Sequence, residues 1–314
     1  MRLFGRLLVV TLAWGALAFG AVYSWGYWPL AVASAALGLW GIFETRAWDD
    51  PRARHLAIAL GSIAVAIFLQ IVPIRHEWLG MLSPSLERFM SEFQLGYQAS
   101  RAHALSLDPP VTATALGLFL AFALLLIGLM RTIRYVNLHT LLNQLMGLGV
   151  LLAILGVVQK ALIDPVDPLL YGFWKPEFGG NPFGPFINRN HFAGWMVMAL
   201  PLVLGYSCAL VYQSRRPGTQ DWQGWLRWMT TVEGSRFLLV AFVVVALGMA
   251  LALTGSRSGI SSFAVATAVF GAFVLTRRAA RRARVLAAIY LSVLLVSAVA
   301  WAGVDRAVDR FGRA

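Results

Sequence analysis

The stretch GPFINRNHFAGWMVMALPLVLG, residues 184–205, combines two features that decide the fold. The run from 191 to 212 is mostly apolar and has the length, about 20 residues, that a helix needs to cross the hydrocarbon core of a bilayer. An arginine, two asparagines and a histidine stand where this run begins. Polar groups at the edge of a membrane span are costly unless they face water or a charged ligand. The stretch therefore predicts a membrane helix with a polar site at its start.

The rest of the chain repeats this pattern of apolar runs and short charged islands. Of the 314 residues, 59% are hydrophobic and only 13% are charged. The alternation of polar and apolar residues that marks a membrane β-barrel is absent. We therefore predict an all-α fold, a polytopic transmembrane bundle of about nine helices, with residues 1–314 forming a single transmembrane domain. The expected spans are 7–23, 29–43, 55–72, 111–130, 138–163, 191–212, 237–254, 260–275 and 285–304.

The distribution of charge predicts the orientation of these spans. With the N-terminus in the cytoplasm, the inner segments carry 16 of the 26 basic residues but only 5 of the 14 acidic ones. This agrees with the rule that Lys and Arg accumulate on the cytoplasmic side. The C-terminus is then expected in the periplasm, and the net charge of +12 reflects membrane orientation instead of nucleic-acid binding. The lone Cys208 cannot form an intramolecular disulfide.

Two outer loops are long, at about 73–110 and 164–190. The first has apolar residues at helical spacing, which predicts an amphipathic helix on the outer membrane surface. These residues are Leu86, Phe89, Met90, Phe93 and Tyr97. The second is rich in proline, glycine and aromatic residues and is expected to be irregular. Its aromatic side chains either stack on sugars or form the interfacial belt common in membrane proteins, and we favour the belt. They are Tyr171, Phe173, Trp174 and Phe178.

Two polar turns on the predicted outer face are candidates for an anion-binding site. In the first, Asn190 is expected to cap the helix that His191 opens, with Arg189 and Asn188 beside it. Backbone N–H groups and the partial positive charge at a helix start favour an anion there. The alternative is an ordinary capped helix whose Arg189 extends to the membrane interface.

The second turn, LTGSRSGISS, spans 253–262 between the seventh and eighth expected spans. Ser256 or Ser258 can cap the following helix, and Arg257 lies at the tip. Taken alone, the turn is better explained as a plain helical hairpin. Because both turns are predicted on the same face, their two arginines together suit a phosphate or pyrophosphate headgroup, whose oxygens guanidinium binds in pairs.

The stretches GPFINRNHFAGWMVMALPLVLG and LTGSRSG, with LSLDPPVTATA at 105–115, resemble the O-antigen ligase and O-antigen polymerase superfamily of bacterial inner membranes. The resemblance implies a glycosyltransferase that moves a glycan from undecaprenyl pyrophosphate to an acceptor on the periplasmic face. The acceptor would be lipid A core, a polysaccharide or a protein hydroxyl. Arg189 and Arg257 would bind the donor pyrophosphate and stabilise its departing charge, with Asn188, Asn190, Ser256 and Ser258 as further contacts. Neither a metal nor another cofactor is implied.

One part of the family pattern is not found in this chain. Family members have a large periplasmic loop after a span like 285–304, and a histidine of that loop is the base on the acceptor. This sequence ends in VDRAVDRFGRA, where such a loop would begin. We therefore expect a fragment, a chain completed by a separate polypeptide, or a catalytically inactive protein. His191 could act as a base, but we favour a positioning role; His103 is the weaker candidate.

Two further classes of function remain open at this point. One is a transporter for an anion or a lipid-linked sugar, and the other is a non-catalytic remnant that binds the donor. Transporters usually place charged residues near the bilayer midplane, whereas here they cluster at the ends of the expected spans. That distribution favours a site at the membrane surface. The acidic residues of the outer loops form no metal-ligand pattern.

Overall fold

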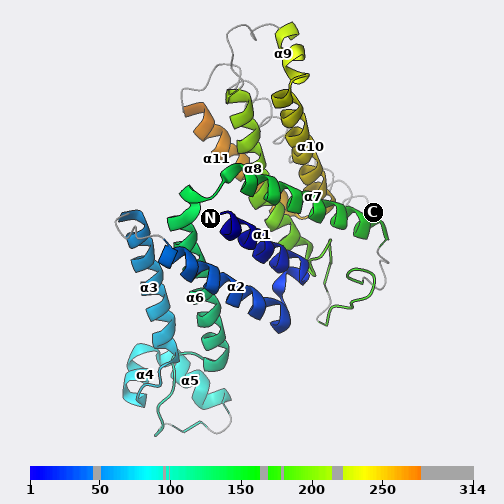
Figure 1. Ribbon diagram of the computed structural model, residues 1–314. Coiled ribbons are helices and arrows are strands. Elements are labelled where there is room, and N and C mark those ends of the chain that lie inside the picture. The colour runs from blue at the N-terminus through cyan, green and yellow to red at the C-terminus, as the bar shows by residue number, and fades with distance from the viewer. Residues whose placement is uncertain are drawn as a thin grey trace. The chain divides into compact units, whose positions relative to one another are not determined.

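A computed structural model describes residues 1–44, 51–94, 97–98, 100–162, 169–177, 180–213 and 222–276 (Figure 1). Within these ranges the chain is helical and its only strand-like pairings are isolated bridges. Among the described residues, six helices are long and apolar enough to cross a membrane. They are α2 (Ser24–Glu44), α3 (Pro51–Ile71), α6 (Pro109–Thr132), α7 (Leu138–Leu162), α8 (Arg189–Gln213) and α10 (Val232–Leu253).

Each of the first eight expected spans coincides with a helix, and the ninth, 285–304, lies outside the described residues. The first and eighth correspond to α1 (Arg2–Leu17) and α11 (Arg257–Thr276), which are helical but are not among the six helices that are long and apolar enough to cross a membrane. The prediction that the first helix runs to residue 23 is wrong, because the chain turns sharply in the short 3-10 segment η1 (Phe19–Ala21), where Gly20 has φ 71°. The second helix begins at Ser24, earlier than predicted, and continues through Pro29.

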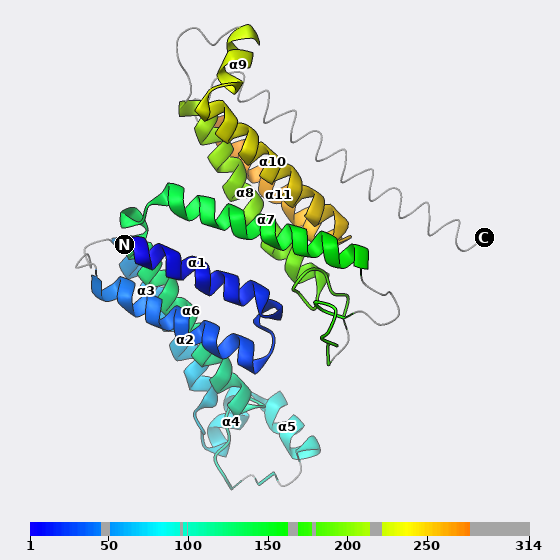
Figure 2. The ribbon, with the colours of Figure 1, turned by 45° about the vertical axis from the view of Figure 1, so that its right-hand side comes forward.

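The described chain packs as two compact units. The first unit comprises 1–12 and 24–138, and its main contact is that of α2 with α6. Helix α3 also packs on α6 (Figure 2). Gly38 and Gly41 lie against Gly128 with backbone touching backbone, so that a Cβ at Gly41 would be 2.7 Å from the Gly128 oxygen. Small residues permit such close helix contact, which is a main source of packing energy between membrane helices.

Two short helices, α4 (His76–Leu82) and α5 (Pro84–Phe93), join α3 to α6. The predicted amphipathic helix corresponds to α5, where Met90 is buried while Phe89 and Phe93 are exposed. It ends before Tyr97, because the backbone becomes extended at the C-cap Gln94. Asp108 caps α6 by accepting a hydrogen bond from the Val111 N–H at 3.1 Å.

The second unit comprises 13–23 and the described residues between 139 and 276. In both views α8, α10 and α11 run side by side, with α8 contacting each of the other two (Figures 1 and 2). One face of α8 is fully buried through Phe192, Met196 and Leu200, which follow one another at four-residue intervals. This spacing places them on a single helical stripe. The short helix α9 (Trp222–Met229) precedes α10.

The loop before α8 is irregular, as predicted, in its described parts 169–177 and 180–188. Leu170 is fully buried, and the Tyr171 hydroxyl donates a hydrogen bond to the Leu17 carbonyl at 2.8 Å. Beneath the start of α8, Phe183 and Phe186 pack on Phe192, with ring centroids 4.7 and 5.8 Å away. These contacts fix where the polar turn of 184–190 lies on the second unit.

Candidate functional site

The first polar turn ends in α8, whose first residue is Arg189. The prediction that Asn190 is the N-cap is wrong: Asn188 occupies that position, and its Oδ1 accepts a hydrogen bond from the Asn190 N–H at 2.8 Å. Capping by an asparagine oxygen satisfies a first-turn N–H that has no partner inside the helix. The cap lies at Asn188 instead of Asn190 because the Asn181 carbonyl accepts a hydrogen bond from the Arg189 N–H at 2.8 Å. This bond fixes the backbone where α8 begins.

The backbone N–H groups at the start of α8 are already bonded locally. Besides the two just described, the His191 N–H donates to the Asn188 carbonyl at 3.0 Å. An anion at this end of α8 is therefore attracted by the helix dipole and by side chains, while the first N–H groups of the backbone are engaged elsewhere. This differs from the expectation that free backbone N–H groups line the site.

The second polar turn joins α10 to α11, and its first helical residue is Arg257. Gly255 has φ 61°, the left-handed conformation that glycine adopts at least cost at a helix end. Ser256 is the N-cap of α11, as one of the two predicted alternatives had it, with its Oγ accepting the Gly259 N–H at 3.1 Å. Its own N–H donates to Thr254 Oγ1 at 3.1 Å, a contact that the sequence analysis missed.

A direct hydrogen bond joins the two turns, which are 66 residues apart in sequence: Ser256 Oγ donates to Asn190 Oδ1 at 2.8 Å. Behind it α8 and α11 approach so closely that a Cβ on Gly259 would lie 2.6 Å from the Ala193 Cβ. A Cβ added to Gly255, in the second turn, would lie 3.5 Å from Nη1 of Arg189. The starts of α8 and α11 thus form one surface.

Each of the two helices opens with an arginine. The Arg189 side chain is half-buried, and among the described residues no carboxylate forms an ion pair with it. Arg257 is exposed. Two guanidinium groups and two positive helix ends therefore belong to one surface, an arrangement that attracts anions and that suits the oxygens of phosphate.

The remaining predicted residues lie in different places around this surface. Ser258 is exposed in the first turn of α11, with its Oγ 3.3 Å from the Ser256 Oγ. His191 is also exposed, in the first turn of α8. Ser256 is only 1% exposed, so its hydroxyl is turned inward to Asn190 and Gly259.

The aromatic residues of the loop gather around η1. Phe19 contacts the rings of Tyr171 and Trp174, and the Trp174 Nε1 donates to the Tyr23 hydroxyl at 3.3 Å. Burial raises the pKa of Tyr171 to about 12. Phe173 is 72% exposed and stacks over Tyr171. Phe178 lies outside the described residues.

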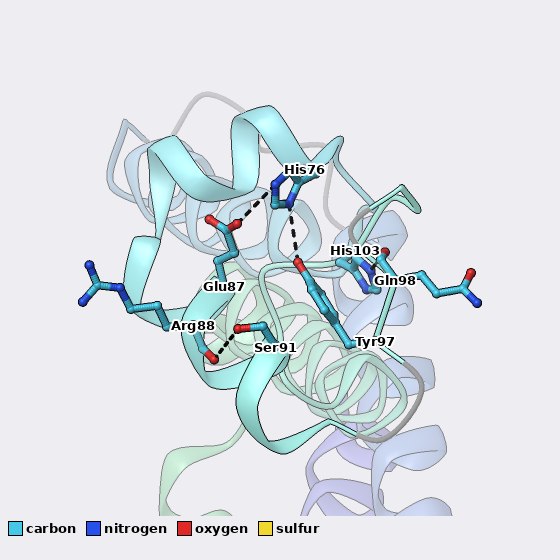
Figure 3. A network of polar contacts seen from close by, with 7 residues as sticks. All are labelled: His76, Glu87, Arg88, Ser91, Tyr97, Gln98 and His103. Atoms are coloured by element: carbon cyan, nitrogen blue, oxygen red, sulfur yellow. Dashed lines mark hydrogen bonds and ion pairs between the residues drawn. The ribbon is translucent and has the colours of Figure 1, made fainter.

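A separate polar network in the first unit was largely unforeseen (Figure 3). Nε2 of His76 lies 3.2 Å from Glu87, and its Nδ1 lies 3.4 Å from the Tyr97 hydroxyl. His103 stacks on Tyr97 and is hydrogen-bonded through Nε2 to the Gln98 carbonyl at 2.9 Å. The sequence offered no signal for this network, since its residues share no helical face.

Metal ligands are not clustered in the described ranges: no three His, Cys, Asp or Glu side chains there are placed to hold an ion. The side chains at the joined turns are those of arginine, asparagine, serine and histidine. Comparison of the chain with protein-family models, with curated proteins and with solved structures found no match.

Proposed function

We propose that this protein is a membrane glycosyltransferase of the O-antigen ligase and polymerase type. Its donor is a glycan carried on undecaprenyl pyrophosphate, and its acceptor is lipid A core, a polysaccharide or a protein hydroxyl. It acts on the periplasmic face of a bacterial inner membrane, in the synthesis of cell-surface polysaccharide. The resemblance of the two arginine turns to that superfamily suggests the reaction, and the geometry of those turns supports it.

One observation carries the proposal: Arg189 and Arg257 each open a helix, and the two helix starts are joined by the hydrogen bond from Ser256 to Asn190. A pyrophosphate has two phosphoryl groups to be neutralised, and guanidinium binds phosphoryl oxygens with two parallel hydrogen bonds. A carboxylate partner would compete for Arg189, but the described residues supply none.

In the reaction, the acceptor hydroxyl oxygen attacks the anomeric carbon of the donor sugar. The new C–O bond forms as the bond from that carbon to the pyrophosphate oxygen breaks, and the electron pair leaves with the pyrophosphate. The arginines stabilise this developing charge, which is electrostatic catalysis by positioned donors. The acceptor proton passes to a base. We assign His191 a positioning role beside Arg189, and the same assay applied to His191→Gln tests whether it also takes the proton.

The test is transfer and binding by arginine variants of the full chain. Arg189→Ala and Arg257→Ala are each expected to weaken binding of undecaprenyl pyrophosphate by roughly 10- to 150-fold, which corresponds to about 1.5–3 kcal/mol for a lost charge-assisted hydrogen bond. Lysine should restore the affinity only in part, since an ammonium lacks the planar fork. Glycan transfer in membrane vesicles should fall in parallel.

The matched control is Arg227→Ala, which removes an exposed arginine of α9, at the other end of α10 from the turn that bears Arg257. It should leave binding and transfer unchanged. Normal transfer by both arginine variants would refute the assignment. Tight binding without transfer by the wild-type chain would identify a donor-binding remnant, and movement of the labelled donor across vesicles without transfer would identify a transporter.

A further inference from the structure

We infer that the side-chain amides of Asn188 and Asn190 are the neutral hydrogen-bond donors of the anion site, and that Ser256 acts by orienting one of them. This inference rests on the proposed function and specifies how the phosphoryl oxygens are held. It concerns side-chain N–H groups, because the first backbone N–H groups of α8 are bonded to Asn181 and Asn188.

The two asparagine oxygens are both engaged as acceptors. Oδ1 of Asn188 receives the Asn190 N–H at 2.8 Å, and Oδ1 of Asn190 receives the Ser256 hydroxyl at 2.8 Å. An amide carries its oxygen and its NH₂ on the same carbon, so fixing the oxygen also fixes the direction of the two N–H donors. Within the described chain, neither NH₂ group has a protein acceptor.

Both NH₂ groups belong to residues that flank Arg189 in the sequence. Asn188 is partly exposed and Asn190 is exposed, so their donors are open to a ligand from outside. A ligand that uses amide N–H donors together with the neighbouring guanidinium groups must present several acceptor oxygens and negative charge. Phosphoryl groups meet both conditions, whereas a metal cation or a neutral sugar does not meet the second.

Ser256 has a different role from that of a ligand contact. Its side chain is 1% exposed, and its Oγ both accepts the Gly259 N–H and donates to Asn190. A hydroxyl with both functions used inside the protein has no proton left for a substrate. Ser256 is therefore a positioning residue, which holds the Asn190 amide in the orientation that directs its NH₂ outward.

Aspartate substitutions separate the structural role of each asparagine from its binding role. Asn188→Asp keeps the capping oxygen, since aspartate caps helices as well as asparagine does. Asn190→Asp likewise keeps the acceptor for Ser256. Each variant replaces two N–H donors with a second oxygen and a negative charge, so the fold is preserved while the anion is repelled. Asn143→Asp, at an exposed position on α7, is the matched control for the added charge.

The measurement is the affinity of the full chain, purified in lipid nanodiscs, for undecaprenyl pyrophosphate, with the thermal midpoint recorded for every variant. Asn188→Asp and Asn190→Asp are expected to lose at least about tenfold in affinity with an unchanged or higher midpoint, as expected for a lost charge-assisted hydrogen bond. Asn143→Asp should match the wild type. Ser256→Ala should weaken binding, and Ser256→Thr, which restores a hydroxyl, should recover most of it.

The outcomes distinguish this inference from the proposed function. Wild-type affinity in both aspartate variants, with binding lost in Arg189→Ala, would overturn the amide assignment and leave the pyrophosphate site standing. Absence of binding by the wild-type chain, or wild-type affinity in Arg189→Ala, would overturn the proposed function and this inference together. If Ser256→Thr binds as poorly as Ser256→Ala, the positioning role of the hydroxyl is wrong.

Discussion

Asn188 and Ser256 hold equivalent positions at the starts of α8 and α11, and both end their turns by capping a helix with a side-chain oxygen. Each is followed directly by an arginine. A capping residue followed by an arginine therefore occurs twice in the second unit. Replacing a capping residue with alanine typically costs about 1 kcal/mol of stability, so these residues contribute both to stability and to the placement of charge.

Tyr171 provides a residue-scale prediction on pH. Its pKa is raised to about 12 by burial, from 10.0, and its hydroxyl donates to the Leu17 carbonyl. Below pH 10 the phenol is protonated in the folded and unfolded states alike, so the contribution to stability is complete. Between pH 10 and 12 the unfolded state loses the proton first, so the free energy of unfolding falls as pH rises through this window.

The measurement for Tyr171 is thermal unfolding of the wild type and of Tyr171→Phe from pH 8 to pH 12. The phenylalanine variant removes the ionising group and retains the ring. The wild type is expected to be the more stable at pH 8 and to lose that advantage by pH 12. If the difference in thermal midpoint between the wild type and Tyr171→Phe stayed constant from pH 8 to pH 12, the ionisation of the Tyr171 hydroxyl would not affect stability as proposed.

At the scale of elements, glycine decides how closely the helices pack. In the first unit Gly38 and Gly41 of α2 lie on the backbone of α6 at Gly128, and in the second unit Gly259 of α11 lies against Ala193 of α8. The first contact joins α2 to α6 in the first unit. The second brings together the two helix starts that form the candidate site, and so links the packing of these elements to the proposed function.

Gly38→Ala tests the first contact. The added methyl group would collide with the Leu124 backbone, which cannot move as a flexible side chain can. We expect a loss of stability of about 1–3 kcal/mol, the usual cost of overpacking. Gly117→Ala is the matched control on α6, since nothing lies within 4 Å of a Cβ there. It should be neutral or stabilise by up to about 1 kcal/mol through helix propensity. Thermal unfolding in nanodiscs measures both, and equal midpoints would contradict the packing argument.

At the scale of the whole molecule, the charge distribution predicts which surfaces face the cytoplasm. In a Cys208→Ser background, a cysteine at Phe173 is expected to react with an impermeant thiol reagent added outside intact cells. A cysteine at Gln223, in α9, should react only after the membrane is permeabilised. Both positions are exposed, so a difference in labelling reports the side of the membrane. The opposite labelling pattern would reverse the proposed orientation and place the candidate site on the cytoplasmic side.

The sequence alone determined the positions of the helices and the identity of the polar turns. Runs of apolar residues interrupted by charge are local features, and a membrane helix satisfies its backbone hydrogen bonds within its own segment. That is why eight expected spans coincide with helices while their ends moved by a few residues. The N-cap of α11 could likewise be predicted from the sequence as one of two candidates, because Ser256 stands directly before the first helical residue.

Only the tertiary structure decided how the polar residues are used. Asn188 instead of Asn190 caps α8 because the carbonyl of Asn181 holds the incoming chain. Asn190 is thereby left to accept the hydroxyl of Ser256, a residue from another helix. Local patterns carry no information on such pairs, which depend on how closely α8 and α11 pack at Ala193 and Gly259. The helices follow from local composition, and the joined site follows from the packing between them.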